Sequence, residues 1–397
     1  EEARRGRPGQ IHLQLGPHLH VRHAEAHRDE LEKGVERLLA NVDREGPGNP
    51  EALNNTPEVP AKWKPLMKTA INQMAGVAKT FLNDSDGATI GLTIDDAGMN
   101  FTMLSAFKSD SYLGKFSNDL KGTDKPLTVG LPAGKYMFFG GAAYDAKVAA
   151  RTIDDVAKPV LDELKKVEGG EKYSKVADAF SASIRTNNGF TLGMPSPEQI
   201  GKEAIVQQVV VYNGGGPEMK TLMTEAVPVF KDFMADLKLP EGQPKTTANH
   251  TPNSKQIEGV TFDTLQLDVQ TNPDDPSAAQ VEMMMNTMYG PEGLSYHYGQ
   301  LGQKDFILTL GANDATIGKF IKAQQAKEDS LSKLEHVKVV TAALPKTRVL
   351  EYYFAADEFA KTMLGVAAQF GARMQVQVPA YLPPIGHRKA PIGVAGG

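Results

Sequence analysis

Three histidines near the start of the chain have the spacing of a metal site. Five of the nine histidines fall within the first 27 residues, and a helix that begins near His20 would place His20, His23 and His27 on one face. Neutral imidazoles at this spacing can bind Zn, Ni or Cu. The alternative is a solvated tail whose histidines titrate at about pH 6.5 without a ligand, which the charged, Gly- and Pro-broken opening EEARRGRPGQ favours.

A glycine-rich stretch, VVVYNGGGPEMK at residues 209–220, has the strand, glycines and helix start that a phosphate-binding loop uses. The Lys and Ser/Thr register of a Walker motif is absent, and Glu218 falls in the first helical turn. A carboxylate there stabilises the positive end of the helix and repels an anion, while Pro217 suits the first helical position. The stretch is therefore interpreted as a turn and helix cap, with anion binding as the alternative.

The tripeptide YHY places His297 between two tyrosines in a predicted strand, so the tyrosines face one way and the histidine the other. A lone strand histidine is more often a satisfied core or surface group than a general base. If the chain is a hydrolase whose site is dispersed along the sequence, His297 and Glu292 are the residues to which the site would be assigned.

The segment EMMMNTMYG, residues 282–290, gathers four of the 15 methionines. Thioethers could bind Cu(I) or line an adaptable pocket for an apolar ligand. The buried side of a helix explains the same pattern and is the interpretation we favour.

The familiar catalytic motifs are absent: the sequence has no G-x-S-x-G, no H-E-x-x-H, no EF-hand loop and no dinucleotide fingerprint. Neighbouring carboxylates such as Asp95 with Asp96 point apart, so they do not form an acid/base pair. Asp145 and Asp314 each follow a strand and a small-residue corner, and both are predicted to cap helices.

Composition limits the class of protein. The 397 residues are 41% hydrophobic and 23% charged, which is enough for a substantial core and two or three domains. A net charge of -5 makes nucleic acid an unexpected partner. The absence of cysteine excludes disulfides and thiolate sites. No apolar run is long enough for a transmembrane helix, and we expect an exported chain whose signal peptide has been removed.

Hydrophobic periodicity predicts the elements that must position these residues. Apolar residues at helical spacing predict a short helix at 23–42, a core helix at 62–82 and a long helix at 146–167. Alternation around the turn at 96–98 predicts an antiparallel hairpin, followed by a short helix at 112–120. PLTVGL at 126–131 and KYMFFGGA at 135–142 are predicted to pair as strands around the turn PAG.

Two pairs of segments suggest an internal duplication. GKYMFFGGAAYDA at 134–146 aligns with QKDFILTLGANDA at 303–315, and VVVYNGGGPEMKTLM at 209–223 aligns with VLEYYFAADEFAKTM at 349–363. The second copy has Phe-Ala-Ala where the first has three glycines, so we expect the same corner to form without glycine.

The order of a long amphipathic helix, DGATIGLTIDDAGMNFTM, a small helix and LPAGKYMFFGG resembles uncharacterised secreted proteins of planctomycete-type bacteria. The resemblance covers about residues 62 to 375 and rests on Asp95, Asp96 and Gly98, then on Leu131, Pro132 and Gly140. It implies export and association with the cell envelope, and it carries no catalytic residue over to this chain.

The sequence thus predicts an α+β fold of two diverged repeats, each with antiparallel strands backed by long amphipathic helices. The predicted parts are an N-terminal helical arm and linker (1–60), a first repeat (61–245), a second repeat (256–376) and a Pro-rich C-terminal tail (377–397). The leading functional hypothesis is a non-enzymatic envelope or extracellular scaffold or binding module. It would contact other proteins, or itself, through the arm and the tail. The alternatives are a carrier of an apolar or lipid-like ligand and the dispersed hydrolase.

Overall fold

The structure is a computed structural model that describes residues 10–14, 17–43, 59–95, 98–169, 171–200, 202–236, 245–270, 278–373 and 392–396. These residues form an α+β protein in which all paired strands are antiparallel. The strands are β1 (Gln10–Gln14), β2 (Ser85–Asp95), β3 (Gly98–Phe107), β4 (Tyr136–Ala143), β5 (Gly189–Pro195), β6 (Gln208–Tyr212), β7 (Lys245–Ile257), β8 (Val260–Gln270), β9 (Leu294–Leu301), β10 (Asp305–Leu310), β11 (Leu350–Phe354) and β12 (Ile392–Gly396).

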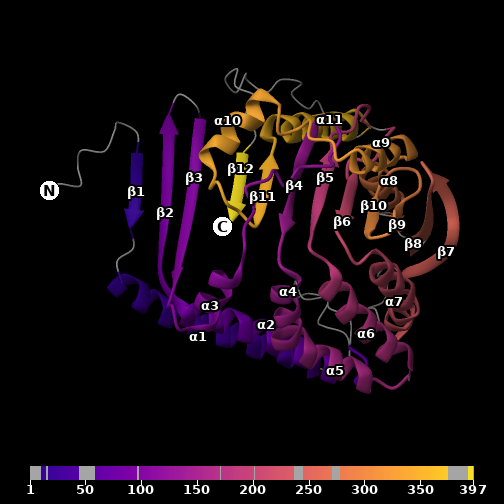
Figure 1. Cartoon of the computed structure of the whole chain (residues 1–397). Coiled ribbons are helices and arrows are strands. Elements are labelled where there is room, and N and C mark those ends of the chain that lie inside the picture. Colours follow the sequence, from indigo (N-terminus) through magenta and orange to yellow (C-terminus); the bar gives the residue numbers. More distant parts are fainter. Residues whose placement is uncertain are drawn as a thin grey trace.

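Helices gather at both ends of the strands (Figure 1). They are α1 (Pro17–Asp43), α2 (Lys64–Asp84), α3 (Tyr112–Asp119), α4 (Ala146–Thr152), α5 (Lys158–Lys166), α6 (Glu171–Thr186), α7 (Gly216–Asp236), α8 (Ala278–Tyr289), α9 (Asp314–Gln325), α10 (Glu335–Ala343) and α11 (Ala356–Arg373). A 3₁₀ turn at Ala61–Trp63 precedes α2, and a π-helical segment at Ile153–Ala157 joins α4 to α5. In Figure 1, α1, α2, α5 and α6 lie below the strands, and α9, α10 and α11 lie above them.

The strands form two sheets. The smaller sheet has the order β1-β2-β3, and the larger has the order β12-β11-β4-β5-β6-β10-β9-β8-β7. In the larger sheet β4, β5 and β6 of the first predicted half form one block between strands of the second, because β4 pairs with β11 and β6 pairs with β10. The two halves therefore share one sheet, a point on which the sequence is silent.

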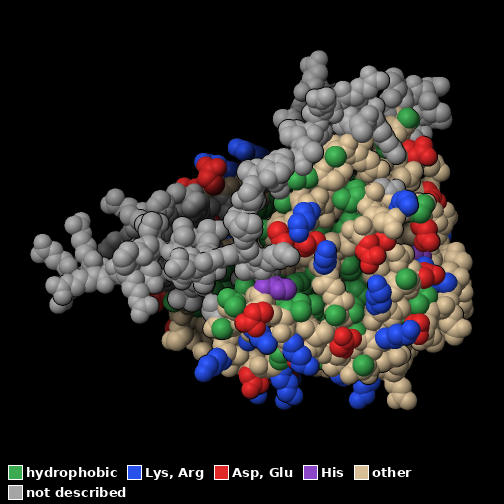
Figure 2. Space-filling view, turned by 90° about the horizontal axis from the view of Figure 1, so that it is seen from above, with side chains coloured by type: hydrophobic (Ala, Val, Ile, Leu, Met, Phe, Trp, Pro, Cys, Tyr) green, Lys and Arg blue, Asp and Glu red, His purple; other side chains and the backbone are tan. Residues whose placement is uncertain are grey.

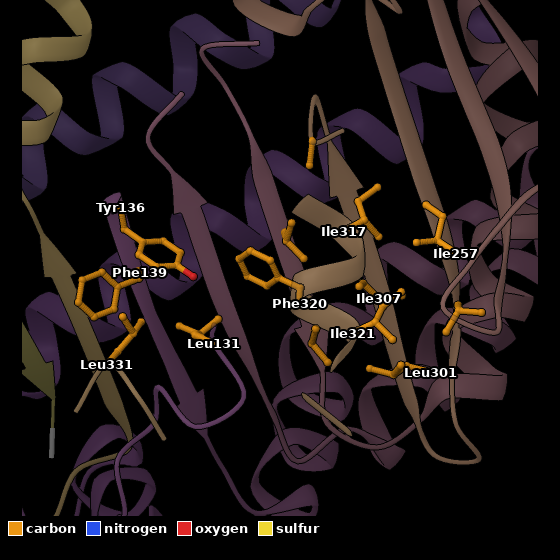
Figure 3. Close-up of a cluster of buried hydrophobic side chains, with 14 of the residues drawn as sticks. Leu131, Tyr136, Phe139, Ile257, Leu301, Ile307, Ile317, Phe320, Ile321 and Leu331 are labelled. Carbon is orange, nitrogen blue, oxygen red and sulfur yellow. The ribbon is translucent and has the colours of Figure 1, made fainter. Parts of the chain in front are cut away.

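One face of the larger sheet carries the main core (Figure 3). Ile317, Phe320 and Ile321 of α9 are at most 1% exposed and pack against strand residues such as Phe139 and Ile307. Burial of each of these large side chains contributes roughly 1.5–3 kcal/mol relative to leaving it in water. The helical spacing of the α9 residues and the alternation in the strands bring these side chains to the same face.

The predicted helix caps are confirmed at one aspartate and shifted at the other. Asp145 caps α4, where its carboxylate accepts a hydrogen bond from the Lys147 backbone N–H at 2.8 Å. At α9 the cap is Asn313, whose side chain accepts from the Thr316 N–H at 2.8 Å. The prediction that Asp314 caps this helix is therefore wrong by one residue; Asp314 begins the helix, where a negative charge is also favourable.

The predicted hairpin and the short helix after it are confirmed as β2 with β3 and as α3. The long helix predicted at 146–167 is helical over almost the whole span, but a π-helical segment divides it into α4 and α5. The predicted strand at 126–131 is wrong, because both edges of β4 are already occupied by β5 and β11. That segment forms turns instead, in which the Leu131 N–H donates to the Thr128 carbonyl at 3.1 Å.

Two segments expected to be irregular contain strands. Lys245–Ile257, which spans the polar stretch between the two predicted repeats, forms β7. Ile392–Gly396 of the predicted C-terminal tail forms β12, which pairs with β11. The sequence signal is weak in both cases because polar residues and glycine are poor strand formers. Pairing with a neighbouring strand overrides that preference.

The α2 helix is confirmed, and the prediction that its apolar face lies in the core holds at its start, where Leu66 packs against the buried Trp63, but is wrong for its later turns. Met74, Val77 and Phe81 are 74%, 47% and 45% exposed. The N-terminal helix forms as predicted and packs on α2, where Val42 of α1 and Ala75 of α2 are buried. No helix in the described part of the chain combines the length and apolar character that a membrane crossing requires.

Candidate functional site

The predicted histidine site lies at the start of the long N-terminal helix. His20, His23 and His27 all fall within α1, so the predicted helical spacing holds for the backbone. Their side chains lie outside the described residues, and metal binding there stays a prediction. Among the side chains that the structure describes, no group of three or more His, Asp or Glu residues has the arrangement of a metal site.

The glycine-rich corner between β6 and α7 is a packed turn. Gly214 and Gly215 have φ angles of 84° and 69°, a region that favours glycine. A Cβ at Gly214 would lie 2.7 Å from the Thr186 carbonyl oxygen, and one at Gly216 would lie 2.4 Å from the Asp305 carbonyl oxygen. The glycines are therefore needed for close contact with neighbouring backbone.

The N–H group that a phosphate would use at this corner already has an anionic partner. The Gly214 N–H donates to the Asp305 carboxylate at 3.0 Å, and the Gly216 N–H donates to the Lys304 carbonyl at 2.7 Å. A carboxylate at this position would repel a second anion, which supports the interpretation as a turn. A strand-to-helix corner without glycine does form between β11 and α11, as expected. Its backbone is different, because Ala355 donates to the Met137 carbonyl and no residue there has a positive φ.

The structure brings together the two residues that the hydrolase alternative singles out. His297 of β9 lies 3.0 Å, through its Nε2, from the Glu292 Oε2 in the loop before that strand. As predicted, the histidine and Tyr298 face opposite sides of the sheet, because neighbouring residues of a strand alternate: His297 contacts Thr264, whereas Tyr298 contacts His250. The His297 side chain is 6% exposed and that of Glu292 is 66% exposed.

A chain of hydroxyl groups continues from the other nitrogen of this histidine. His297 Nδ1 lies 2.8 Å from the Thr264 Oγ1, which lies 2.6 Å from the Ser254 Oγ. The Ser254 Oγ also lies 3.1 Å from the Phe262 carbonyl oxygen. Four hydrogen-bonding contacts thus run from the carboxylate on the surface to a backbone carbonyl of β8.

The hydrogens available to this chain depend on the protonation state of His297. An imidazolium supplies two hydrogens and the two hydroxyls supply one each, which matches the four contacts. A neutral imidazole leaves three hydrogens for four contacts, so one contact has no donor. The hydrogen bonds therefore favour the charged ring, whereas burial and Lys255 oppose it. Burial has the largest effect, and the pKa of His297 is lowered from 6.5.

The histidine borders a small pocket of about 130 Å³. Its wall includes Glu292, Ser295 and the backbone of Gly290, Gly293 and Gly311. The Ser295 hydroxyl donates its hydrogen to the Glu292 carbonyl at 2.7 Å. Since each imidazole nitrogen has a partner, the ring could act as a base only after the exposed Glu292 side chain turned away. The group within reach would then be a water molecule and not a side-chain nucleophile.

A second histidine cluster lies on the opposite face of β8, and sequence reasoning did not find it. The His250 Nε2 lies 2.9 Å from the Tyr298 hydroxyl and 3.9 Å from the Asp263 carboxylate. Asp263 also accepts a hydrogen bond from the Asn253 backbone N–H at 2.8 Å. Burial, followed by the nearby Asp263 charge, raises the pKa of Tyr298 to about 12. The alternation of β8 and β9 could have indicated a shared face, but β7 was not predicted as a strand.

A buried ion pair was also missed. Arg348 and Glu351 are 4% and 1% exposed, and their Nε and Oε2 atoms lie 2.9 Å apart. The same carboxylate accepts hydrogen bonds from the Leu127 N–H at 2.8 Å and from the Tyr353 hydroxyl. Residues three apart near a strand are not expected to meet, so their spacing gave no signal.

Comparison with protein families, with curated proteins and with solved structures finds no match to this chain.

Proposed function

We propose that the chain is a non-enzymatic binding or scaffold protein that is exported to the cell envelope or the extracellular space. The observation that carries this proposal is a set of large apolar side chains left in water on the side of the molecule formed by α8, α10 and α11. Met284, Val339 and Phe359 are 49%, 46% and 42% exposed. Figure 2, seen from above, shows hydrophobic side chains between charged ones on this side. Large apolar side chains left exposed on one side of a protein are typical of surfaces that bind a partner.

The use of the polar groups supports the same proposal. Among the side chains that the structure describes, Glu351 and His297 are both engaged in contacts within the chain. Export is supported by the resemblance of the segments around Asp95 and Leu131 to secreted planctomycete-type proteins. The expected partners are envelope or extracellular proteins.

The proposal is tested by sedimentation of the purified chain with the envelope fraction of the producing cells. We expect retention at micromolar concentration, and an apparent dissociation constant raised about tenfold or more in Met284→Glu and Val339→Glu, because a charge replaces an apolar contact. Asn286→Glu is the matched control, since it adds the same charge on an exposed position of α8. Equal binding of all variants, or no retention of the wild type, would overturn the proposal.

We also propose that the two halves are diverged repeats. The proposal is supported by the pairing in the larger sheet, where β4 of the first half pairs with β11 of the second. The aligned strands pair in the same way, because β10, which aligns with β4, pairs with β6, which aligns with β11. The registers differ: Gly140 lies opposite Tyr352, whereas Thr309, aligned with Gly140, lies opposite Val209 and not Tyr212. The divergence would thus include a slip in strand register.

The carrier hypothesis has less support. The two hollows found among the described residues, of about 130 and 320 Å³, both open at the surface. The face of the larger sheet under α9 is filled by side chains. An acyl chain would need an enclosed apolar cavity comparable to ordinary ligand sites of about 300–1,000 Å³.

The second candidate function is a hydrolase, and the contact of 3.0 Å between His297 and Glu292 beside a pocket is the observation that favours it. Hydrolysis of short p-nitrophenyl esters tests it, with His297→Asn as the variant and His250→Asn as the matched control. Turnover lost about 100-fold or more in His297→Asn alone would support general-base catalysis on water. Equal turnover in both variants would remove this function.

A further inference from the structure

The α1 and α2 helices form an antiparallel pair whose open side is apolar. Two ion pairs fix the alignment of the helices: Lys68 lies 2.5 Å from Asp43, and Lys79 lies 2.9 Å from Glu32. Both pairs have residue numbers that add to 111, so Leu38 of α1 lies level with residue 73 of α2.

Apolar residues of α2 recur with the alternating spacing of three and four residues that coiled-coil and bundle helices use to contact one another. The residues of this α2 stripe are Met67, Ala70, Met74, Val77 and Phe81. The last three are the exposed residues described above, and Leu38 of α1 is 53% exposed. Leu38 follows Glu32 by six residues and Met74 follows Lys68 by six. A helix turns by about 100° per residue, so each of these two residues is rotated by the same angle from an ion-paired residue that points toward the other helix. In an antiparallel pair, equal rotations of this kind place Leu38 and Met74 on the same side.

The charges around the α2 stripe restrict what can cover it. No charged residue occurs from Thr69 to Ala78. The lysines that bound this segment, Lys68 and Lys79, are both paired with acids of α1. An acidic partner would therefore find no free cation on this segment. A membrane surface would require a basic polar face, whereas α1 carries six acidic and only four basic residues.

A second copy of the chain satisfies these conditions. Two identical helix pairs related by a two-fold axis present the same uncharged stripe to each other, so the contact brings no like charges together. Four helices packed in this way form a bundle with a shared apolar core. Apart from the backbone of α2 itself, no heavy atom lies within 4 Å of the Cβ position at Gly76, beside the stripe, so a facing helix could approach closely.

We propose that the chain forms a homodimer through the α1–α2 helix pair, with the α2 stripes of the two copies in contact. This inference deepens the proposed function and rests on it, since it assigns one of the partners of a binding module. It leaves the surface formed by α8, α10 and α11 free, because that surface lies at the opposite end of the strands in Figure 1.

Sedimentation velocity of the full chain over a range of concentrations tests the proposal. We expect a wild-type species of twice 42.9 kDa at micromolar concentration. Met74→Glu should raise the dimer dissociation constant about 100-fold, because it places two carboxylates in an apolar contact. The change should not disturb folding, since Met74 is 74% exposed. Asn72→Glu adds the same charge to an exposed position outside the stripe and should leave the dimer intact.

The absence of cysteine from the chain allows a direct measurement of proximity. Single cysteines are introduced at Ala70, Met74, Val77 or Phe81, and at Asn72 as the control, and each variant is oxidised with copper phenanthroline. A disulfide forms only where the two Cα atoms come within about 7 Å. We expect cross-linked dimer to peak at one stripe position, the one nearest the two-fold axis, and to be low at Asn72.

A monomeric wild type, or a dimer equally sensitive to Asn72→Glu and Met74→Glu, would overturn the dimer while leaving the proposed function intact. The two proposals can also be separated in the other direction. If Val339→Glu loses envelope binding while the mass of the dimer is unchanged, the result supports the proposed function independently of the dimer. Cross-linking that is equally efficient at Asn72 and at the stripe positions would also contradict the assigned surface.

Discussion

Replacement of Glu351 by glutamine tests whether the buried ion pair stabilises the join between the two halves of the larger sheet. The carboxylate of Glu351 is 1% exposed and receives the Leu127 N–H, the Tyr353 hydroxyl and the Arg348 side chain. Glutamine keeps the size of the side chain but presents an amide N–H₂ to one of these three donors. It also leaves the Arg348 charge buried without its counter-ion.

The magnitude follows from the burial of the partner that remains. Arg348 Nε lies 2.9 Å from the carboxylate without hydrogen-bond alignment, so the attraction lost is mainly Coulombic. Removing one member of a buried pair costs about 3–5 kcal/mol. The Arg348 Nη1 keeps contacts with the Pro345 and Lys346 carbonyls, which places the expected loss for Glu351→Gln near the lower limit, at about 3 kcal/mol.

Urea unfolding followed by far-UV circular dichroism and by the fluorescence of Trp63, the single tryptophan, measures this loss. Glu335→Gln is the matched control because the Glu335 side chain is 85% exposed, and it should change the free energy of unfolding by less than about 0.5 kcal/mol. The double variant with Arg348→Met should recover about 2 kcal/mol of the loss, since no buried charge is then left unpaired. Equal unfolding midpoints for Glu351→Gln and Glu335→Gln would refute this account of the ion pair.

Two further predictions concern the glycine-rich corner and the buried histidine. Gly214→Ala should lower the free energy of unfolding by about 2–3 kcal/mol, because it combines a positive φ with a Cβ 2.7 Å from a carbonyl oxygen. Gly302→Ala is the control, with φ 63° and open space around the Cβ, and should lower it by about 1 kcal/mol. Equal urea midpoints for the two variants would contradict the close-contact argument. The lowered pKa of His297 means that the folded chain binds fewer protons than the unfolded chain just below pH 6.5, so stability is lost as the pH falls through that range. The stability difference between wild type and His297→Asn, from urea unfolding at pH 7 and pH 5, should therefore shrink at the lower pH, and a constant difference would show that the histidine does not titrate in this way.

Local pattern was sufficient for elements whose signal lies within one segment. The helical spacing from residue 62 onward predicted α2, and the turn between Asp95 and Gly98 predicted the hairpin of β2 with β3. The prediction of a strand at 126–131 was wrong because β5 and β11 occupy both edges of β4. Pairing between distant strands of this kind cannot be inferred from a local pattern. Similarly, β7 and β12 form because a neighbouring strand is available.

Sequence reasoning recovered one part of the candidate site. It selected His297 and Glu292, which meet at 3.0 Å because the loop before β9 folds back along that strand. It did not predict Thr264, Ser254 or His250, since their contacts depend on the pairing of β7 with β8 and of β8 with β9. Residues on neighbouring strands meet according to register, which is set by the sheet as a whole.

Several side-chain hydrogen bonds in this chain join segments that are distant in sequence. The Leu127 N–H donates to Glu351 across 224 positions, the Trp63 indole donates to Asp236 across 173 positions, and Gln324 donates to Thr191 across 133 positions. Each contact satisfies a buried or half-buried polar group, which would otherwise destabilise the fold. These groups are used inside the fold, and the proposed binding surfaces consist of exposed apolar side chains. Their division between α1–α2 and the α8, α10 and α11 surface suits a chain that binds a second copy at one end of its strands and a different partner at the other.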